Sequence, residues 1–160
     1  MAIYMKVPGV DGNVTAEGFA KWINLDSLQF GTGRAISMEV GNLSNREATK
    51  PNISEITVSK ETDGASSGLL NESLVGAKGK KIELVVVKTG AKAVEEVLRY
   101  TLGDALISAF SMSSGAEGMP HESISVSFGH LEVSFTAHKD TGDVANVERV
   151  AYDLATAKPG

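Results

Sequence analysis

Alternation of apolar and polar side chains is the feature that most limits how this chain can fold. The alternation is strict in Ile3–Val7, Ile124–Phe128 and Leu131–Phe135. Side chains two positions apart lie on the same face of a strand, so a period of two predicts half-buried β-strands. Further runs of strand-like composition are Trp22–Phe30, Ala35–Val40, Ile53–Lys60, Lys81–Lys88 and Arg149–Leu154. We therefore expect a mainly β fold, an antiparallel barrel or sandwich.

Three of these segments also predict how the sheet is covered and where it bends. Leu84–Val87 is apolar at every position, which is typical of a strand covered on both faces. Ile124–Phe128 and Leu131–Phe135 alternate in opposite phase, and the switch falls at Gly129 and His130. A glycine allows a strand to bulge or bend at a barrel corner, so we expect a bend at this point.

The segment Gly64–Gly76 predicts the only substantial helix. Leu69, Leu70 and Leu74 share one helical face, and the glycine after them is a typical helix end. Ser66 is placed to cap the N-terminus, because a serine hydroxyl accepts a hydrogen bond from a free backbone N–H there.

A second segment, Val94–Leu102, fits two structures. Its apolar residues have helical spacing and its glutamates favour a helix, yet the same stretch also fits a strand with one apolar face. The residue pattern alone leaves this choice open. Neither a repeat nor a composition change divides the chain, so we expect one domain over residues 1–160.

The apolar pattern stops between residues 41 and 52, where asparagine, serine, threonine and charged residues take over. Long polar loops inside compact domains are often functional, although plain solvated connections have the same composition. The loop is therefore either a connection or a contact surface.

Composition removes several classes of function. A net charge of −5 gives no attraction for nucleic acid or for an anionic membrane. The chain holds no run of about 20 apolar residues, so we expect no membrane insertion. Met1–Gly12 lacks the pattern of a signal peptide, so we expect no export by that route. Cysteine is absent, which excludes disulfides, thiolate metal ligands and a cysteine nucleophile.

One short motif suggests hydrolase chemistry. Gly64–Gly68 matches G-x-S-x-G between a predicted strand and a predicted helix, and His121, His130 and His138 follow it. The alternating strands and helices of a parallel hydrolase sheet are missing, however, so capping is the favoured role of Ser66. The histidines have no partners at ligand spacing. We expect no catalytic residue, no cofactor and no metal.

The order of features along nearly the whole chain resembles the haemolysin-coregulated protein (Hcp) family of type VI secretion systems. The resemblance rests on an opening strand, a long strand beginning Trp-Ile-Asn-Leu, a polar loop ending in Lys-Pro, a helix and a late pair of strands. The matching segments are Ile3–Val7, Val10–Gly12, Trp22–Gly31, Lys50–Pro51, Ile53–Lys60, Asp63, Ser66, Ile107–Ser111, Pro120–Phe128, Leu131–Phe135 and Ala151–Thr156.

This resemblance implies a closed antiparallel β-barrel with one short flanking helix, and it makes Val94–Leu102 a strand. It implies a structural subunit without catalytic residues, six copies of which form a ring. Rings stack into a hollow tube for effector delivery, and a spike protein, a contractile sheath and effector proteins are its partners. The subunit is then bacterial and cytoplasmic during assembly, and is afterwards secreted without a signal peptide. Two alternatives remain. The first is a small β-barrel that binds a peptide or ligand, and the second, less favoured, is a hydrolase built on Ser66.

Within the resemblance, the extended loop at 41–52 is the expected ring-stacking site. Its polar and charged side chains have almost no apolar neighbour to hold them on their own core. The candidate contact residues are Asn45, Arg46, Glu47, Thr49 and Lys50. Asp143–Arg149 follows the family only loosely, so the pairing of the C-terminal segment is left open.

Overall fold

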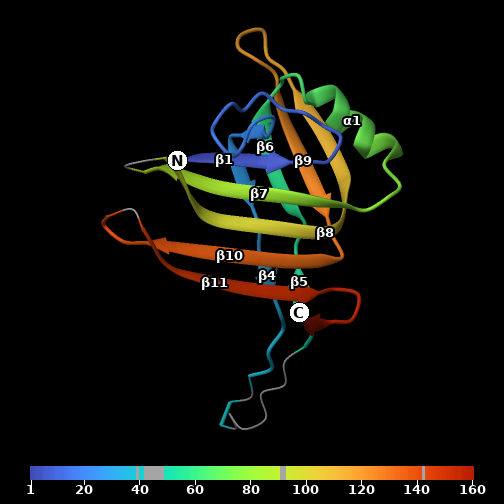
Figure 1. Ribbon diagram of the computed structural model, residues 1–160. Helices are drawn as coiled ribbons and strands as arrows, with labels where there is room; N and C mark the ends of the chain where they lie inside the picture. The colour runs from blue at the N-terminus through green and yellow to red at the C-terminus, as the bar shows by residue number, and fades with distance from the viewer. Residues whose placement is uncertain (39, 42–48, 91–92, 142) are drawn as a thin grey trace.

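The computed structural model describes residues 1–38, 40–41, 49–90, 93–141 and 143–160 (Figure 1). Within these residues the chain forms strands joined only by antiparallel pairings, and one helix. The elements are β1 (Ala2–Lys6), β2 (Ile23–Leu25), β3 (Ser27–Gln29), β4 (Thr32–Gly33), β5 (Asn52–Ile53), β6 (Ile56–Glu61), α1 (Ser66–Val75), β7 (Lys80–Thr89), β8 (Val94–Ser113), β9 (His121–Ser127), β10 (His130–His138), β11 (Val144–Asp153) and β12 (Lys158–Pro159).

Strand β8 joins two parts of the sheet system. Its first half pairs with β7 and β10, and its second half pairs with β9. The main sheet runs β12-β11-β10-β8-β7-β1-β2, while β9 leads through β6 to β3. The mainly β, antiparallel fold with one helix is thus confirmed, and closure into a barrel stays a prediction.

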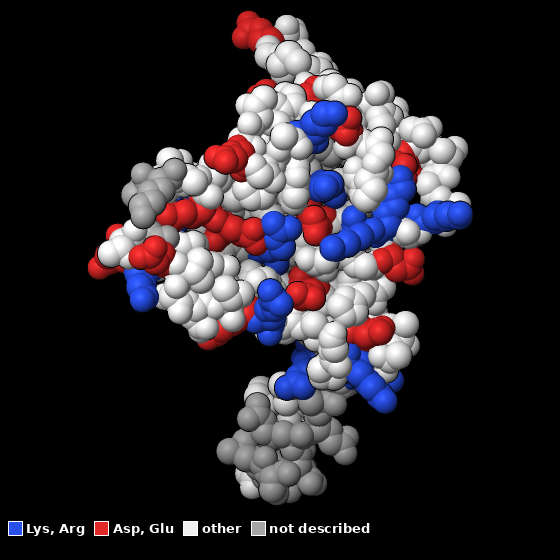
Figure 2. Space-filling view, viewed as in Figure 1, with Lys and Arg blue, Asp and Glu red and all other residues white. Residues whose placement is uncertain are grey.

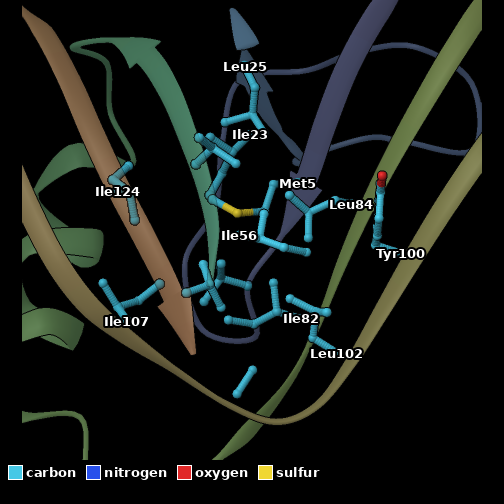
Figure 3. Packing of buried hydrophobic residues seen from close by; sticks show 14 of the residues in the cluster. Met5, Ile23, Leu25, Ile56, Ile82, Leu84, Tyr100, Leu102, Ile107 and Ile124 are labelled. Atoms are coloured by element: carbon cyan, nitrogen blue, oxygen red, sulfur yellow. The ribbon is translucent and has the colours of Figure 1, made fainter. Parts of the chain in front are cut away.

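The main core lies between these two parts. Met5, Leu84 and Leu102 from one part face Ile56 and Ile124 from the other, and all five side chains are fully buried (Figure 3). These residues occupy alternate strand positions, as the period of two predicts. Packing of this kind fixes the strand register, because a slip of one residue would turn every apolar side chain outward.

The bend predicted at Gly129 divides β9 from β10. Ile124 and Val126 on β9, and Leu131 and Val133 on β10, are all buried in the main core despite their opposite phase. The two strands pair with different halves of β8, so a change of partner accompanies the change of phase.

A second, smaller core covers the other face of β1 and β7. Trp22 and Phe19, from the segment that follows β1, pack with Val85 and Val87 of β7. The Trp22 and Phe19 rings meet edge to face with centroids 5.1 Å apart. Because Leu84 on the same strand faces the main core, β7 is covered on both faces, as its apolar run predicts.

Val94–Leu102 is confirmed as a strand. It forms the first half of β8, which pairs with β7 on one edge and, from Leu98 onward, with β10 on the other. Cross-strand pairing here outweighs the local preference of the glutamates for a helix, because intrinsic propensities are small compared with tertiary packing.

Several predicted strand bounds are wrong where a strand changes partner. Asp26 divides Trp22–Phe30 into β2, which pairs with β1, and β3, which pairs with β6. Ile53–Lys60 likewise divides into β5 and β6. Residues 35–38 belong to no strand, and residue 39 lies outside the described part. The last strand begins earlier than predicted, since β11 starts at Val144 and pairs along β10.

The helix is placed as predicted but packs differently. Only Leu69 of its predicted apolar face is fully buried, whereas Leu70 and Leu74 are 42% and 73% exposed. The helix ends at Val75, and Gly76 follows as the C-cap. One leucine therefore anchors α1 to the core.

Candidate functional site

The predicted cap at Ser66 is wrong, because Ser66 is the first residue of the helix and Ala65 occupies the N-cap position. The Ser66 hydroxyl instead accepts a hydrogen bond from the Asp63 amide at 3.0 Å and donates to Glu122 Oε2 at 2.9 Å. Asp63 stabilises the turn before the helix, because its Oδ1 accepts a hydrogen bond from the Ala65 N–H. The Ser66 hydroxyl is buried and hydrogen-bonded to Asp63 and Glu122, and no histidine is among its partners. A catalytic serine would instead be exposed and paired with a base.

A buried ion pair lies beneath this helix start. Lys60 Nζ is 2.7 Å from Glu122 Oε2 and 2.8 Å from Asp63 Oδ1, and both Lys60 and Glu122 side chains are completely buried. Lys60 also donates to the Glu61 carbonyl and the Ser66 hydroxyl. Glu122 Oε1 has no hydrogen-bond partner among the described residues. This network joins β6, β9 and α1.

The sequence signal for this pair is that both residues fall at the strand positions occupied by buried apolar residues, and we did not predict the pair from it. Lys60 follows the buried Ile56 and Val58 at the same period, and Glu122 precedes the buried Ile124 in the same way. The two strands pair with Lys60 directly opposite Glu122. A lysine and a glutamate in phase with core residues on neighbouring strands therefore predict a buried pair.

The three histidines lie in separate environments, and none of them is hydrogen-bonded to Ser66. His121 Nδ1 is 4.0 Å from Asp26 Oδ2 at the exposed end of β9, and His130 Nε2 is 3.0 Å from the Gly160 carbonyl. His138 lines an open groove on β10. In the part of the chain that the structure describes, no three histidine, aspartate or glutamate side chains form a metal-binding group.

The surface around β10 and β11 exposes large apolar side chains. Phe135, Val144, Val147 and Val150 are 50%, 58%, 43% and 61% exposed. Val150 lies opposite the buried Val133, so the core face of the sheet continues outward into solvent. Phe135 lies on this core face as well, whereas Val144 and Val147 lie on the opposite, outer face of the sheet. Exposed apolar side chains of this kind are typical of a contact site for another macromolecule.

Strand β11 also has a free edge. Beyond its pairing with β10, β11 meets β12 at Tyr152 and Asp153, and the Gly160 N–H donates to the Ala151 carbonyl at 3.1 Å. The second edge of residues 144–150 therefore has no strand among the described residues. An unprotected edge can pair with another strand, because its backbone N–H and C=O groups are open. We call β11 and the outer half of β10 the β10–β11 surface.

A groove of about 490 Å³ adjoins this surface on the outer face of the sheet. Val144 and Val147 form its apolar side, and Glu96, Arg99 and Glu132 line it as well. The hydrogen bonds from Arg99 to Glu96 raise the pKa of the guanidinium, so Arg99 is a permanent cation here. Figure 2 shows charges of both signs interspersed over the face of the molecule turned to the viewer, without a field of one sign.

The predicted stacking loop is only partly described. Asn45, Arg46 and Glu47 lie outside the described residues, whereas Thr49 and Lys50 lie within them. Thr49 Oγ1 accepts the Ala35 N–H at 3.0 Å, and the Thr49 N–H donates to the Ala35 carbonyl at 2.9 Å. These bonds and the β4–β5 pairing join the two sides of an arm that runs away from the body (Figure 1).

The described helix is too short and too polar to span a bilayer. No curated protein sequence matches the chain. Residues 4–135 match the profile of a family described as "Type VI secretion system effector, Hcp".

Solved structures are similar over almost the full length. A type six secretion system protein is 22% identical, with 99% of each chain covered and a TM-score of 0.90. Hcp1 from Salmonella typhimurium is 21% identical, with 99% of this chain and 98% of that chain covered and a TM-score of 0.78. A type VI secretion system effector from Yersinia pestis is 20% identical, with 94% and 98% covered and a TM-score of 0.74. At these identities the structures establish a shared fold, and their agreement extends past residue 135 to the C-terminal strands.

Proposed function

The chain belongs to the Hcp family of type VI secretion system proteins, and on this premise we propose that it is a structural subunit of the secretion tube. Six copies join head to tail into a closed ring, and rings stack into a hollow tube that delivers effector proteins. The observation that carries this proposal is the β10–β11 surface, whose exposed valines and free edge suit contact with another copy.

A head-to-tail contact is compatible with ring closure. The β10–β11 surface includes one sheet edge, and β2 at the other end of the main sheet path carries no comparable set of exposed apolar residues. A contact between two different surfaces repeats from copy to copy, and it closes into a ring when the rotation returns to its start. Closure buries every copy of the apolar surface, which leaves none for unlimited growth.

We also propose that each subunit is a closed barrel. Support comes from β2 and β3, which are separated only by Asp26 and pair with β1 and β6 in turn. The Asp26 N–H donates to the Ser59 carbonyl at 2.8 Å, which continues the β6 pairing across the break. Counted as one bent strand, β2 and β3 complete a circuit through β1, β7, β8, β9 and β6. Bends of this kind form the corners of small barrels.

The remaining parts of the proposal concern the machine around the ring. The spike protein, the contractile sheath and effector proteins are the partners, and neither nucleic acid nor a membrane is one. The subunit assembles in the bacterial cytoplasm and leaves through the machine. It has no catalytic role, and the engagement of Ser66 with Lys60 and Glu122 supports this reading over a hydrolase.

Val150→Asp is expected to abolish the ring without unfolding the subunit. The side chain is 61% exposed in the single chain, so the free energy of unfolding should change by less than about 0.5 kcal/mol. In the ring, the new carboxylate would be buried in the subunit contact without an ion-pair partner. Light scattering should report the mass of one chain. Met119→Asp, at a site 55% exposed between β8 and β9, is the control that should keep the ring. A Val150→Asp protein that stays fully assembled would remove the β10–β11 surface from the contact.

We further propose that Asn45, Arg46, Glu47, Thr49 and Lys50 contact the next ring in the stack. Lys50 is exposed, and the hydrogen bonds between Thr49 and Ala35 hold the base of the arm rather than the body of the subunit. Each exposed ion pair contributes only about 0–1 kcal/mol, but all copies in a ring engage together.

Deleting Asn45–Thr49 should therefore weaken stacking and secretion while the thermal unfolding midpoint stays nearly unchanged. Electron microscopy would count rings against stacked tubes, and calorimetry would give the midpoint. Lys50→Glu keeps the loop length and tests the charge alone. A deletion that unfolds the subunit would show that the loop belongs to the core.

A further inference from the structure

The helix α1 has little stability of its own. The structure describes all of its residues, and Leu69 is the only leucine among them that is fully buried. Within the described chain, α1 lacks a side-chain N-cap bond, an acidic residue in its first turn and a basic residue in its last turn. Gly68, Asn71 and three serines are weak helix formers. Isolated helices of 10 residues are marginal in water, so α1 depends on its contacts with the rest of the fold.

Lys60 holds the start of this helix. Its ammonium group is 3.2 Å from the hydroxyl of Ser66, the first residue of α1, and 2.8 Å from Asp63 in the turn before it. Glu122 on β9 accepts hydrogen bonds from both Lys60 and Ser66. Polar groups therefore join the helix start to β6 and β9.

Lys80 holds the other end of the helix. Its Nζ is 2.6 Å from Glu72 Oε1 on α1 and donates to the Pro8 carbonyl at 3.0 Å. Lys80 is the first residue of β7, so this side chain connects α1 with the main sheet and with the segment after β1. The Lys80 and Glu72 side chains are only 28% and 20% exposed, which limits the screening of their attraction by salt.

The helix covers a part of the fold that strands leave open. It packs against β8 (Figure 1). From Leu106 onward, β8 pairs with β9 alone among the described residues, so its second edge has no strand there. Ala65 and Leu69 join the main core from this side. Natural sheets often cover an open edge with a helix or a loop, and α1 fits this role.

We propose that α1 is a lid that opens as one local unit, together with its connections to β6 and β7, while the strands stay folded. Lys60 and Lys80 are the two latches that keep it closed. Proteins open locally in contiguous units, and those with few buried apolar contacts open most easily. An open lid exposes Ala65 and Leu69 and leaves the edge of β8 able to pair with another chain, so the latches also limit unwanted strand pairing. This inference is independent of the ring.

Thiol labelling tests the lid, because the chain has no cysteine. Ala65→Cys places a thiol under the lid at a site 1% exposed, and Val126→Cys places one on β9 at a site 0% exposed. Both changes alter the side-chain volume only slightly. In native buffer with excess aromatic disulfide reagent, Ala65→Cys should react about 100-fold or more faster than Val126→Cys. Equal rates would mean that α1 opens only when the whole subunit unfolds, which would overturn the proposal.

Hydrogen exchange of the unsubstituted protein makes the same comparison without a new side chain. The amides of α1 should exchange about 100-fold or more faster than those of β6 and β9, each relative to its rate in an unfolded chain. Exchange of all three elements at one rate would contradict the lid, even where a cysteine variant fails to fold.

The latch is tested by adding Lys80→Met or Lys81→Met to the Ala65→Cys protein. Each change removes one positive charge, but Lys80 pairs with Glu72 on the helix, whereas Lys81 lies 3.2 Å from Glu83 on β7. Lys80→Met should speed labelling of the introduced thiol about tenfold, and Lys81→Met should leave it within about twofold. Hydrogen exchange of β6 and β9 should be the same in both. Equal labelling rates for the two variants would show that Lys80 is not a latch.

Discussion

Lys60→Met is expected to destabilise the subunit by about 3–5 kcal/mol, because it leaves the Glu122 carboxylate buried and unpaired. Lys60 Nζ is the hydrogen-bond donor to four groups, the Glu61 carbonyl, Asp63, Ser66 and Glu122. Of the two Glu122 oxygens, Oε1 already has no partner in the described residues, so only Oε2 is satisfied. Without the lysine, Oε2 retains the Ser66 hydroxyl alone.

A double variant distinguishes the loss of the ion pair from the cost of leaving one charge buried and unpaired. Lys60→Met with Glu122→Leu removes both charges and fills similar volume, so its cost should be much smaller than that of Lys60→Met alone. Urea unfolding should be measured in the Val150→Asp background, because assembly would otherwise add a concentration-dependent stability. A single variant that loses less than about 1 kcal/mol would mean that the pair is more solvated than the structure indicates.

Trp22→Ala should cost about 3–5 kcal/mol, the range found for removing a large buried aromatic side chain. Trp22 is 7% exposed and packs against Phe19, with Lys6 and Arg99 placed over its ring at 5.9 Å and 5.7 Å from the centroid. Its loss would uncover Val85 and Val87 on the outer face of β7. The segment that precedes Trp22 should then detach, which hydrogen exchange would detect.

Two variants calibrate this result. Trp22→Phe retains most of the apolar volume and should cost distinctly less than Trp22→Ala. Phe135→Ala removes an aromatic side chain that is 50% exposed, and in the Val150→Asp background it should cost less than about 1 kcal/mol. Equal losses for Trp22→Ala and Phe135→Ala would contradict the second core.

The period of two predicted most of the sheet because burial on one face imposes it locally. Ile3–Val7, Ile124–Phe128 and Leu131–Phe135 all contribute to strands whose apolar residues enter the core. The bounds failed at Asp26 and before Ile56, where a strand changes its partner. Partner choice depends on residues far away in sequence, so local alternation carries no record of it.

In the candidate site, too, some features could be predicted from local sequence and others depend on distant residues. Ser66 has the residue type of a helix cap, yet its hydroxyl is drawn to Glu122, which is 56 positions away. Lys60 and Glu122 could have been found from the sequence, since both are in phase with buried residues. The exposure of Val147 and Val150 could not, because an apolar residue in a strand is read as core until the fold shows that nothing covers it.

The central claim is that copies of this chain close into a ring of six. The most direct measurement is the molar mass of the native protein by light scattering after gel filtration, across a range of concentrations. We expect six times the 16.8 kDa mass of the chain, or whole multiples of that mass where rings stack, because the lateral contacts are closed within each ring. A mass of one chain at every concentration, or a series of masses that are not multiples of six chains, would contradict a ring of six.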